Sequence, residues 1–439
     1  MSGVVPIPTR RFVAVVAVAA LVLAALPGGR WAAFWIVDGA LAALLVADRL
    51  WTLRPGRVGV ARSLPGALTI GATGQVEWTV TNPTDRALRV AVADELAPSL
   101  GAGRRRLAVR LPGRGAATVT TIIRPSRRGR FTPSAVAVRV TGPLGLASRQ
   151  ATRALPGELR VLPPFPSKAE AELRINRARV PEVGLRSARG RGGGTEFDQL
   201  REYTADDEFR RIDWSATARV DRPIVRQYRA ERNQHLLLLL DNGRTMAAQV
   251  AGVPRVEHAM DAAMMITAVA TRLGDRTGLV AFDRQVRAVV PPSAQRSQLS
   301  AVTEALYDLE PVLAESDFRG AFTHAVARFR RRSLLIVLTE LAEASVTETL
   351  IPALPVVARR HLVLVGAVRD PEVVRLATQP VLQGADAHAR AAAIAALERR
   401  RRTIHVLRAA GATVVDALPG RLAPELTDAY LHLKATGRL

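Results

Sequence analysis

The chain opens with two uninterrupted apolar runs, residues 12–26 and 31–47, which are separated by Pro27-Gly28-Gly29. Each run is slightly shorter than the roughly 20 residues that cross a hydrocarbon core as a helix. The second run contains one acid, Asp38. A Pro-Gly-Gly break is typical of a tight turn between two helices. The pattern therefore predicts a two-helix membrane anchor over residues 1–50.

The orientation of this anchor follows from the basic residues around it. A cleaved signal peptide is the competing interpretation, but a second apolar run follows at once and no clear small-x-small cleavage site lies between the two runs. Basic residues flank the pair on both sides, and one lies in the connection: Arg10 and Arg11 before it, Arg49, Arg54, Arg57 and Arg62 after it, and Arg30 within it. Positive-inside counting then places both ends, and the bulk of the chain, in the cytoplasm of a two-span protein of the cell membrane.

From residue 51 to residue 155 the pattern changes to short alternating runs that are divided by turn residues, as in "QVEWTVTNPTDRALRVAVAD". Period-two alternation with regular turn signals predicts an antiparallel β-sandwich-like module of about seven strands. This region offers no catalytic constellation, so a structural or protein-binding module is expected. Residues 156–200 lack strong periodicity and are predicted to be a linker. Its glycines, Gly192–Gly194, lack the Gly-Lys-Ser/Thr ending of a phosphate-binding loop.

The remainder, residues 201–439, alternates between buried strands and helices. Strands are expected at 236–240, 276–282, 284–292, 333–340, 361–368 and 411–418, and helices at 255–273, 295–309, 318–331, 347–359 and 387–409. The five consecutive leucines Leu236–Leu240 leave no polar face, as in a strand covered by helices on both sides. The prediction is an α/β domain with a doubly wound, Rossmann-like sheet. Ligands bind such sheets at the carboxyl ends of the strands, where Asp241 lies.

Composition narrows the possible chemistry. The chain has 439 residues, enough for two or three domains, and no cysteine, which excludes disulfides, thiolate metal sites and a cysteine nucleophile. Its net charge of +23 comes almost entirely from arginine, since Lys168 and Lys434 are the only lysines. Arginine binds phosphate well, so anionic lipid and nucleic acid are both conceivable partners. The arginines are scattered and are not interleaved with aromatic residues, so no specific nucleic acid is expected.

Residues 201–232, "REYTADDEFRRIDWSATARVDRPIVRQYRAER", resemble the signature of the bacterial family DUF58. The matching positions are Arg201, Tyr203, Asp207, Arg210, Ile212, Asp213, Trp214, Ala218, Arg219, Arg226, Glu231 and Arg232. Asp206 departs from the pattern, where the family has glycine. The resemblance extends to the apolar beginning, to a "RRGRF…GPLGL" segment that ends at residue 146, and to the closing "YLHLKATGRL".

The acids and arginines of this signature predict a mesh of ion pairs that fixes a loop. We expect Trp214 to anchor the loop in a core. Asp207 and Asp213 are poor candidates for general acid catalysis, because neighbouring arginines would keep both ionised. A structural or partner-binding role is therefore favoured for Arg201, Tyr203, Asp207, Arg210, Asp213, Trp214, Arg219, Arg226, Glu231 and Arg232.

The second half of the family is similar to a von Willebrand factor A domain, which often carries a metal-ion-dependent adhesion site. That site begins Asp-x-Ser-x-Ser, and here the loop reads Asp241-Asn242-Gly243-Arg244-Thr245. Gly243 supplies no hydroxyl, and Arg244 opposes a cation. What the resemblance implies is a degenerate Mg²⁺ or Mn²⁺ site built from Asp241, Thr245, Ser316, Asp317 and Glu340, with Thr339 beside the last. The alternative is a capped turn in which Asp241 and Thr245 bind helix amides.

The function that the resemblance implies is protein binding rather than catalysis. Similar proteins commonly accompany AAA+ ATPases of the MoxR type, so we expect a cytoplasm-facing interaction module that works with such an ATPase on a client protein, in protein remodelling or complex maturation. Two alternatives stay open. One is a metal-dependent hydrolase that uses Asp241, Asp317 and Glu340. The other is an arginine-rich binder of phosphate or lipid surfaces.

Overall fold

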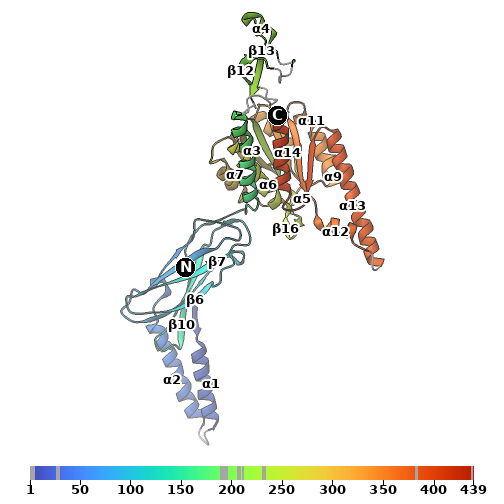
Figure 1. Cartoon of the computed structure of the whole chain (residues 1–439). Helices are drawn as coiled ribbons and strands as arrows, with labels where there is room; N and C mark the ends of the chain where they lie inside the picture. Colours follow the sequence, from blue (N-terminus) through green and yellow to red (C-terminus); the bar gives the residue numbers. More distant parts are fainter. Residues whose placement is uncertain are drawn as a thin grey trace. The chain divides into compact units, whose positions relative to one another are not determined.

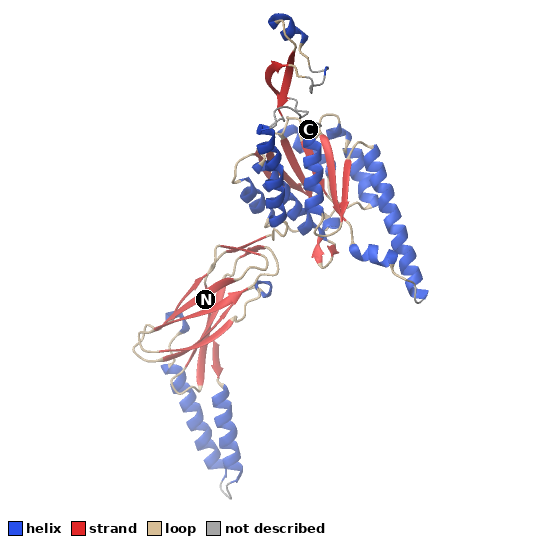
Figure 2. Ribbon diagram, viewed as in Figure 1, coloured by secondary structure: helices blue, strands red, loops and turns tan. Residues whose placement is uncertain are grey.

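The computed structural model describes residues 5–25, 30–187, 196–204, 209, 212–229, 234–380, 384–436 and 439. The chain forms two compact units, Met1–Leu162 and Pro163–Leu439. Together they make a mixed α/β protein with several sheets (Figures 1 and 2).

The first unit contains two long helices near its start, α1 (Arg10–Ala25) and α2 (Arg30–Trp51), and they lie side by side (Figure 1). Large apolar side chains such as Leu21, Trp31 and Ile36 are more than two-thirds exposed on them. An apolar surface of this kind is expected where a helix faces lipid. By length and composition, the segment Trp31–Arg57 qualifies as a membrane span.

The rest of this unit is a β-module whose strands are divided among three sheets. One sheet has the order β1-β10-β9-β5-β6, one β2-β4-β7 and one β3-β11-β8. The strand bounds are β1 Val5–Pro8, β2 Gly59–Ser63, β3 Ala67–Thr69, β4 Gly74–Thr81, β5 Leu88–Asp94, β6 Arg106–Leu111, β7 Ala116–Ile123, β8 Gly129–Phe131, β9 Ala135–Thr141, β10 Ala147–Ala154 and β11 Leu159–Leu162. Alternate residues such as Val76, Trp78 and Val80 face one shared core, as the period-two pattern predicts. One pairing, β3 with β11, is parallel.

The segment predicted as a linker is instead structured through much of its length. It contains strand β11 and helix α3 (Lys168–Ser187). Ala171 and Ile175 of α3 are buried in the core of the second unit, and Ser167 donates hydrogen bonds from its amide and hydroxyl to Asp261. The linker prediction over 156–200 was therefore wrong, because two apolar residues one helical turn apart are enough to dock a helix against a neighbour, although they give little periodicity. Gly192–Gly194 lie outside the described residues.

A six-stranded sheet forms the centre of the second unit, in the order β18-β17-β14-β19-β20-β21. Strand β18 pairs antiparallel and the other pairs are parallel. The bounds are β14 His235–Asp241, β17 Arg276–Phe282, β18 Val286–Ser293, β19 Leu334–Leu338, β20 Leu362–Val368 and β21 Thr413–Ala417. These strands confirm the α/β alternation expected of residues 201–439.

Helices cover both faces of this sheet, and the leucines of β14 show why. Leu236, Leu238 and Leu240 belong to one apolar cluster, and Leu237 and Leu239 belong to the other. The first cluster is completed by α3, α6 (Arg255–Arg272), α7 (Gln298–Leu306) and α14 (Leu422–Ala435). The second is completed by α8 (Phe318–Arg328), a helical stretch from 343 to 358 and α13 (Gly384–Ala409). Two short helices lie near the carboxyl ends of the strands, α5 (Arg244–Ala247) and α12 (Pro371–Thr378).

The opposite edge of the sheet, where the parallel strands begin, is its amino edge. A buried acid, Asp275, lies there. It accepts hydrogen bonds from the hydroxyl of Tyr430 and the backbone amide of Gln234, and the ammonium of Lys434 lies 2.5 Å away. Burial and the neighbouring carboxylate raise the pKa of Tyr430 well above its ordinary value. Tyr430 and Lys434 of α14 thus bind the acid at this end of the sheet.

Candidate functional site

The geometry of the carboxyl edge centres on Asp241, the last residue of β14, which is 1% exposed. Its Oδ1 accepts hydrogen bonds from the Ser316 hydroxyl at 2.5 Å and from the Gly243 amide at 2.8 Å. Its Oδ2 accepts a hydrogen bond from the Thr339 hydroxyl at 2.6 Å. Ser316 precedes α8 and Thr339 follows β19, so three loops converge on one carboxylate.

The charge of Asp241 is therefore balanced by neutral donors. Burial raises its pKa, while the bonds from Ser316, Thr339 and Gly243 oppose that rise and Glu315 adds to it. Desolvation disfavours the charged form of a carboxyl, and hydrogen bonds to that form favour it. The net direction is upward, so burial outweighs the three donors.

Gly243 lies where the adhesion-site pattern has a serine. A Cβ at this position would lie 2.0 Å from the hydroxyl oxygen of Ser316 and 2.9 Å from the carbonyl oxygen of Ala314. Contacts of that length cannot be accommodated without movement of the backbone or of Ser316. The hydroxyl of Ser316 therefore takes the place that a serine side chain at 243 would need.

The two residues after Gly243 point elsewhere. Arg244 forms an exposed ion pair with Glu315, 2.5 Å between Nη2 and Oε1. It therefore does not pair with Glu340 and does not neutralise Asp241 directly. Thr245 is partly buried on the short helix α5, whose N-cap is Gly243 and has no side-chain cap. The capped-turn alternative holds only in part, since Asp241 accepts the amide of Gly243.

The carboxylate of Asp317 binds a backbone amide of the helix that follows it. Asp317 is the N-cap of α8, and its Oδ1 accepts the amide hydrogen of Gly320 at 2.8 Å. An N-cap acid satisfies one of the unpaired amides of the first helical turn. The side chain is exposed and makes this local contact rather than one with Asp241.

Glu340 belongs to a network of ion pairs beside the Asp241 cluster. Its carboxylate lies 2.5 Å from Arg400 and 3.1 Å from Arg255. Arg400 also contacts Asp416 at 2.9 Å, and it donates to the carbonyl oxygen of Val368. Burial lowers the pKa of Arg400, but Glu340 and Asp416 outweigh burial and raise it. This arrangement fixes one guanidinium between two strand ends, β19 and β21.

The donors at this edge do not fit the predicted divalent cation as they stand. Of the five predicted ligands, only Asp241 and Ser316 are in contact, and Thr339 joins them. The single carboxylate already accepts a hydrogen bond on each oxygen, while Asp317 and Glu340 are engaged with an amide and with two arginines. Mg²⁺ needs near-octahedral oxygen ligation, usually with carboxylates facing the ion. Among the described residues, no three His, Cys, Asp or Glu side chains are grouped closely enough to hold a metal.

A shallow groove of about 230 Å³ lies next to the ion-pair network. Its cationic side chains come from Arg255, Arg369, Arg399 and Arg400, and its apolar side chains include Leu341, Val373 and Leu397. The groove thus combines apolar side chains with charges of both signs, since Glu340, Glu343 and Asp370 also line it. No local signal in the sequence marks Arg255 or Arg400. Arg400 is one of four consecutive arginines, and the strand ends that bind it are far away along the chain.

The signature region forms a separate substructure of the second unit. Strand β12 (Glu196–Glu202) pairs antiparallel with β13 (Ile224–Arg229), and helix α4 (Trp214–Val220) connects them (Figure 1). Asp213 caps α4 by accepting the amide hydrogens of Ser215 and Ala216. Arg219 donates to the carbonyl oxygen of Ser215, and the Tyr203 amide donates to Pro223. Asp207, Arg210, Glu231 and Arg232 lie outside the described residues, as does the side chain of Arg226.

Trp214 corrects one prediction for this region. It is 61% exposed, and its ring packs edge to face against Phe209, which is also exposed, with centroids 5.6 Å apart. The expectation that Trp214 anchors a core was wrong, because the described part of this region, a two-stranded sheet with one short helix, offers no second layer that could bury a large ring. The motif therefore places two aromatic rings on the surface.

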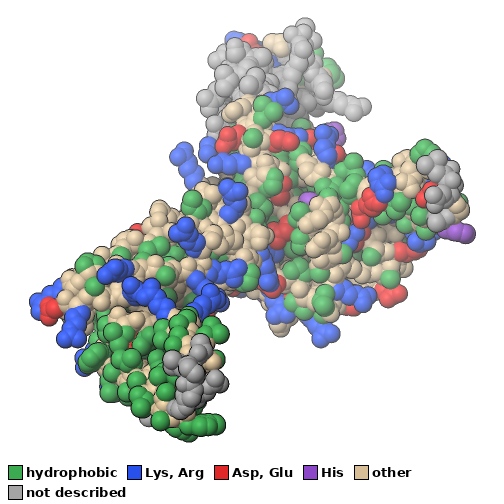
Figure 3. Space-filling model, turned by 90° about the horizontal axis from the view of Figure 1, so that it is seen from below, with side chains coloured by type: hydrophobic (Ala, Val, Ile, Leu, Met, Phe, Trp, Pro, Cys, Tyr) green, Lys and Arg blue, Asp and Glu red, His purple; other side chains and the backbone are tan. Residues whose placement is uncertain are grey.

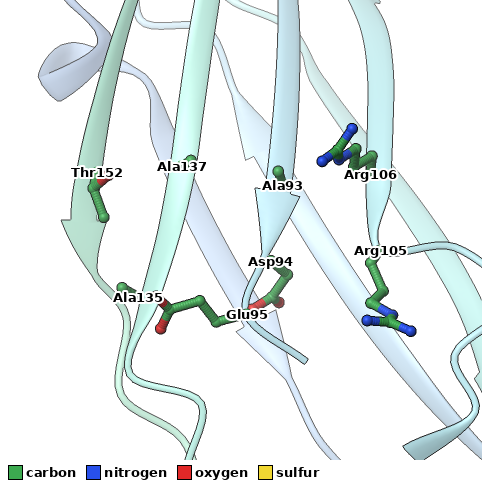
Figure 4. Close-up of a pocket in the computed structure, with 8 residues that line it drawn as sticks. All are labelled: Ala93, Asp94, Glu95, Arg105, Arg106, Ala135, Ala137 and Thr152. Atoms are coloured by element: carbon green, nitrogen blue, oxygen red, sulfur yellow. The ribbon is translucent and has the colours of Figure 1, made fainter. Parts of the chain in front are cut away.

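A separate hollow lies on the β-module, with a volume of about 310 Å³ (Figure 4). Ala93, Ala135 and Ala137 line it with small side chains, and Glu95 and Arg105 lie toward one end of it (Figure 4). Asp94 is not available there, because it accepts hydrogen bonds from Arg62 and from the Trp78 ring nitrogen. The hollow is unrelated to the residues that the sequence singled out.

Comparison with known proteins agrees with the sequence signature. Residues 199–409 match the family described as "Protein of unknown function DUF58". Two uncharacterized mycobacterial proteins, Rv1480 of Mycobacterium tuberculosis and Mb1516 of Mycobacterium bovis, are each 28% identical over 187 residues. The aligned region is 42% of this chain and spans 58% of those relatives.

Two solved structures align with 24% of this chain, at low similarity. A CARDB domain from Pyrococcus furiosus is 13% identical, covering 24% of this chain and 93% of that domain, with a TM-score of 0.17. The WR4 protein of C. elegans, an MSP family member, is 10% identical, covering 24% of this chain and 96% of its own, also with a TM-score of 0.17.

Proposed function

We propose that this chain is a membrane-anchored, non-enzymatic interaction module whose α/β unit grips a partner protein at the carboxyl edge of its main sheet. The supporting observation is that Asp241 accepts hydrogen bonds from Ser316, Thr339 and Gly243, while Arg400 beside it pairs with both Glu340 and Asp416. A rigid, charged and hydrogen-bonded face with an adjoining groove suits recognition. A reaction centre would instead need a carboxylate or hydroxyl that is poised toward substrate.

The architecture supports a relationship to von Willebrand factor A domains. What supports it is a sheet with helices on both faces, and an acid at the end of a central strand that meets side chains from two further loops. In this proposal the edge serves the same purpose as an adhesion site, and it binds its partner by way of the groove that Glu340 and Arg400 border.

The anchor is proposed to cross the membrane twice. Strand β1 before α1 pairs antiparallel with β10, which follows α2, from Val5 with Gln150 to Pro8 with Ala147. Two strands of one sheet must lie on the same side of a bilayer. That pairing supports a hairpin, and the excess of arginine at its ends supports a cytoplasmic β-module.

The proposed partner is a MoxR-type AAA+ ATPase, as the DUF58 resemblance implies, acting on a client protein. The test is co-purification of the detergent-solubilised full chain with such an ATPase from the same cells. Capture is measured with Mg²⁺ and, in parallel, with EDTA. We expect specific capture of the ATPase, and recovery of no such ATPase under either condition would refute the partnership.

The place of binding is tested by a charge reversal that leaves the fold intact. Arg399 is an exposed residue of the groove, so Arg399→Glu should weaken capture by about tenfold or more. Glu372→Ala, which removes an exposed acid that pairs with Arg375, is the control and should not change capture. Equal capture by both variants would locate the interface elsewhere.

A further inference from the structure

The junction between the two helices and the β-module is held by one buried acid. Asp48 of α2 is completely buried. Its Oδ1 accepts the amide hydrogen of Leu144 at 2.8 Å, and its Oδ2 accepts those of Leu146 and Ala147 at 2.8 and 2.7 Å. Leu144 and Leu146 belong to the "GPLGL" loop between β9 and β10, and Ala147 begins β10. A Cβ on Gly142 would lie 2.4 Å from Asp48 Oδ1, so glycine is needed for this close approach.

The same loop also holds the start of α1. The Thr9 hydroxyl donates to the carbonyl oxygen of Gly145, and the Thr9 amide donates to that of Leu146. The start of α1 and the end of α2 are therefore both hydrogen-bonded to the segment of residues 142–147. All three hydrogen bonds to Asp48 come from the backbone, so its charge is balanced by peptide dipoles and not by a guanidinium.

Arginines gather around this junction. The guanidiniums of Arg11 and Arg89 lie 3.4 and 3.9 Å from the position of a Cβ on Gly145. Burial, with the nearby charges of Arg49 and Arg54, lowers the pKa of Arg149. Figure 3, which views the molecule from below, shows basic side chains beside the apolar surface of this unit. We call Arg11, Arg49, Arg54, Arg89 and Arg149 the arginine collar.

The collar has no acid to neutralise it. Residues 1–162 contain 22 arginines and 7 acids, a net charge of +15 of the chain's +23. Asp48 is the only acid between residues 39 and 76, and no acid occurs between residues 96 and 157. Among the described residues no ion pair is found for the collar, and the Nε of Arg149 is buried without a hydrogen-bond partner. Clustered guanidiniums without counter-charges repel one another unless an anion lies between them.

We propose that the arginine collar binds the headgroups of anionic phospholipids. The collar surrounds the β-module ends of the two apolar helices, which is where a bilayer's phosphates lie if those helices span it. Guanidinium pairs phosphate oxygens through two parallel hydrogen bonds and is the side chain best suited to this contact. Lipid binding here fixes the β-module against the membrane surface, because Asp48 and Thr9 join the collar to both helices. The inference rests on the proposed membrane anchor.

The test uses the full chain in a neutral detergent and titrates it with phosphatidylglycerol. Phosphatidylcholine of the same acyl chains is titrated in parallel, and so is inorganic phosphate. Thermal unfolding reports an apparent dissociation constant. We expect phosphatidylglycerol to bind about tenfold or more tightly than phosphatidylcholine, since each basic residue near an anionic surface contributes about fivefold. A response to inorganic phosphate equal to that of phosphatidylglycerol would identify a free-phosphate site and overturn the proposal.

The matched variants remove equal charge at two places. Arg54→Gln, Arg89→Gln and Arg149→Gln are combined in the collar variant. Arg330→Gln, Arg359→Gln and Arg401→Gln, exposed residues of the other unit, form the control. The collar variant should lose the preference for phosphatidylglycerol and the control should keep it. If the collar variant does not fold, the single variant Arg89→Gln, at an exposed position, should still show about a fivefold loss.

Failure of the anchor and failure of the lipid site give different results. Carbonate extraction of native membranes tests the anchor. Release of the chain into the soluble fraction would refute the membrane span on which the inference rests. Retention in the membrane, with equal affinity for the two lipids or with an unchanged preference in the collar variant, would refute lipid recognition alone.

Discussion

The two ends of the central sheet each bury an aspartate, and each end satisfies its acid in a different way. At the amino edge, Asp275 is paired with the ammonium of Lys434 and also bound by Tyr430. At the carboxyl edge, Asp241 is bound only by neutral donors, and burial raises its pKa. A buried acid that is paired with a cation has a structural role, because removing either partner destabilises the fold. A buried carboxylate whose donors are neutral keeps its protonation state open to change, which suits the edge proposed to meet a partner.

Removing the acid at the amino edge should have the largest effect. Asp275→Ala leaves Lys434 and the Tyr430 hydroxyl without their acceptor in a buried site, at a cost of about 3–5 kcal/mol in the free energy of unfolding. Urea unfolding of the detergent-solubilised chain, followed by circular dichroism, measures this. Glu372→Ala, on the surface, is the control and should leave the transition unchanged. A loss of unfolding free energy no greater than that of the control would show that Asp275 does not stabilise the fold.

The next largest effect is expected from restoring the missing serine at the carboxyl edge. Gly243→Ser places a Cβ against the Ser316 hydroxyl, and such overpacking costs about 1–3 kcal/mol. Adding Ser316→Ala should recover much of that loss. Gly66→Ser, where a Cβ meets nothing within 4 Å, should cost little. If Gly243→Ser unfolds at the same urea concentration as the wild type, the loop is not closed by Ser316.

The pH dependence sharpens the contrast between the two acids. Asp241→Asn should change the free energy of unfolding at neutral pH by about 1 kcal/mol or less, because the hydroxyl donors can reorient. The folded pKa of Asp241 is raised above its ordinary value of 3.8. Its contribution to stability is therefore fully present below that value and is lost as pH rises through the raised pKa.

The measurement is the stability of the wild type minus that of Asp241→Asn, from urea unfolding across the acid range. This difference should shift in favour of the wild type as pH falls. A difference that stays constant with pH would mean that the pKa of Asp241 is the same in the folded and unfolded chain.

The smallest effect is expected at Thr245. Its hydroxyl does not reach the Asp241 carboxylate, whereas that of Thr339 does at 2.6 Å. Thr339→Val should therefore cost about 1 kcal/mol, and Thr245→Val roughly half a kcal/mol or less. Thermal unfolding of the two variants side by side decides the matter. A larger loss at Thr245 would mean that the predicted ligand, and not Thr339, supports the site.

Much of the fold was predictable, because a strand that is buried on both faces has an uninterrupted apolar sequence. The all-apolar runs at 236–240 and 334–338 predicted central strands, and the alternation around Trp78 predicted sandwich strands. Helix α3 was missed since two buried residues give too weak a period. Trp214 was misplaced because sequence spacing does not show whether a second layer exists to cover a ring.

The carboxyl edge was predictable as a place, and only in part as a set of contacts. Chain order after a parallel strand puts Asp241, Ser316 and Thr339 at one edge, so their meeting follows from α/β topology. The direction in which a carboxylate turns depends on competing donors. Asp317 turned to an amide of its own helix, and Glu340 turned to Arg255 and to Arg400, 60 residues further along the chain.

The sequence by itself determined which residues are apolar, where strands alternate with helices, and how strongly arginine outweighs acid in the first 162 residues, because these depend on local period and composition. Only the tertiary structure decided which partner each buried acid receives. Asp48 meets backbone amides, Asp275 an ammonium and Asp241 two hydroxyls. Each of these donors is distant in sequence, and the desolvation cost of a buried charge makes the folded chain select whichever donors packing brings within reach.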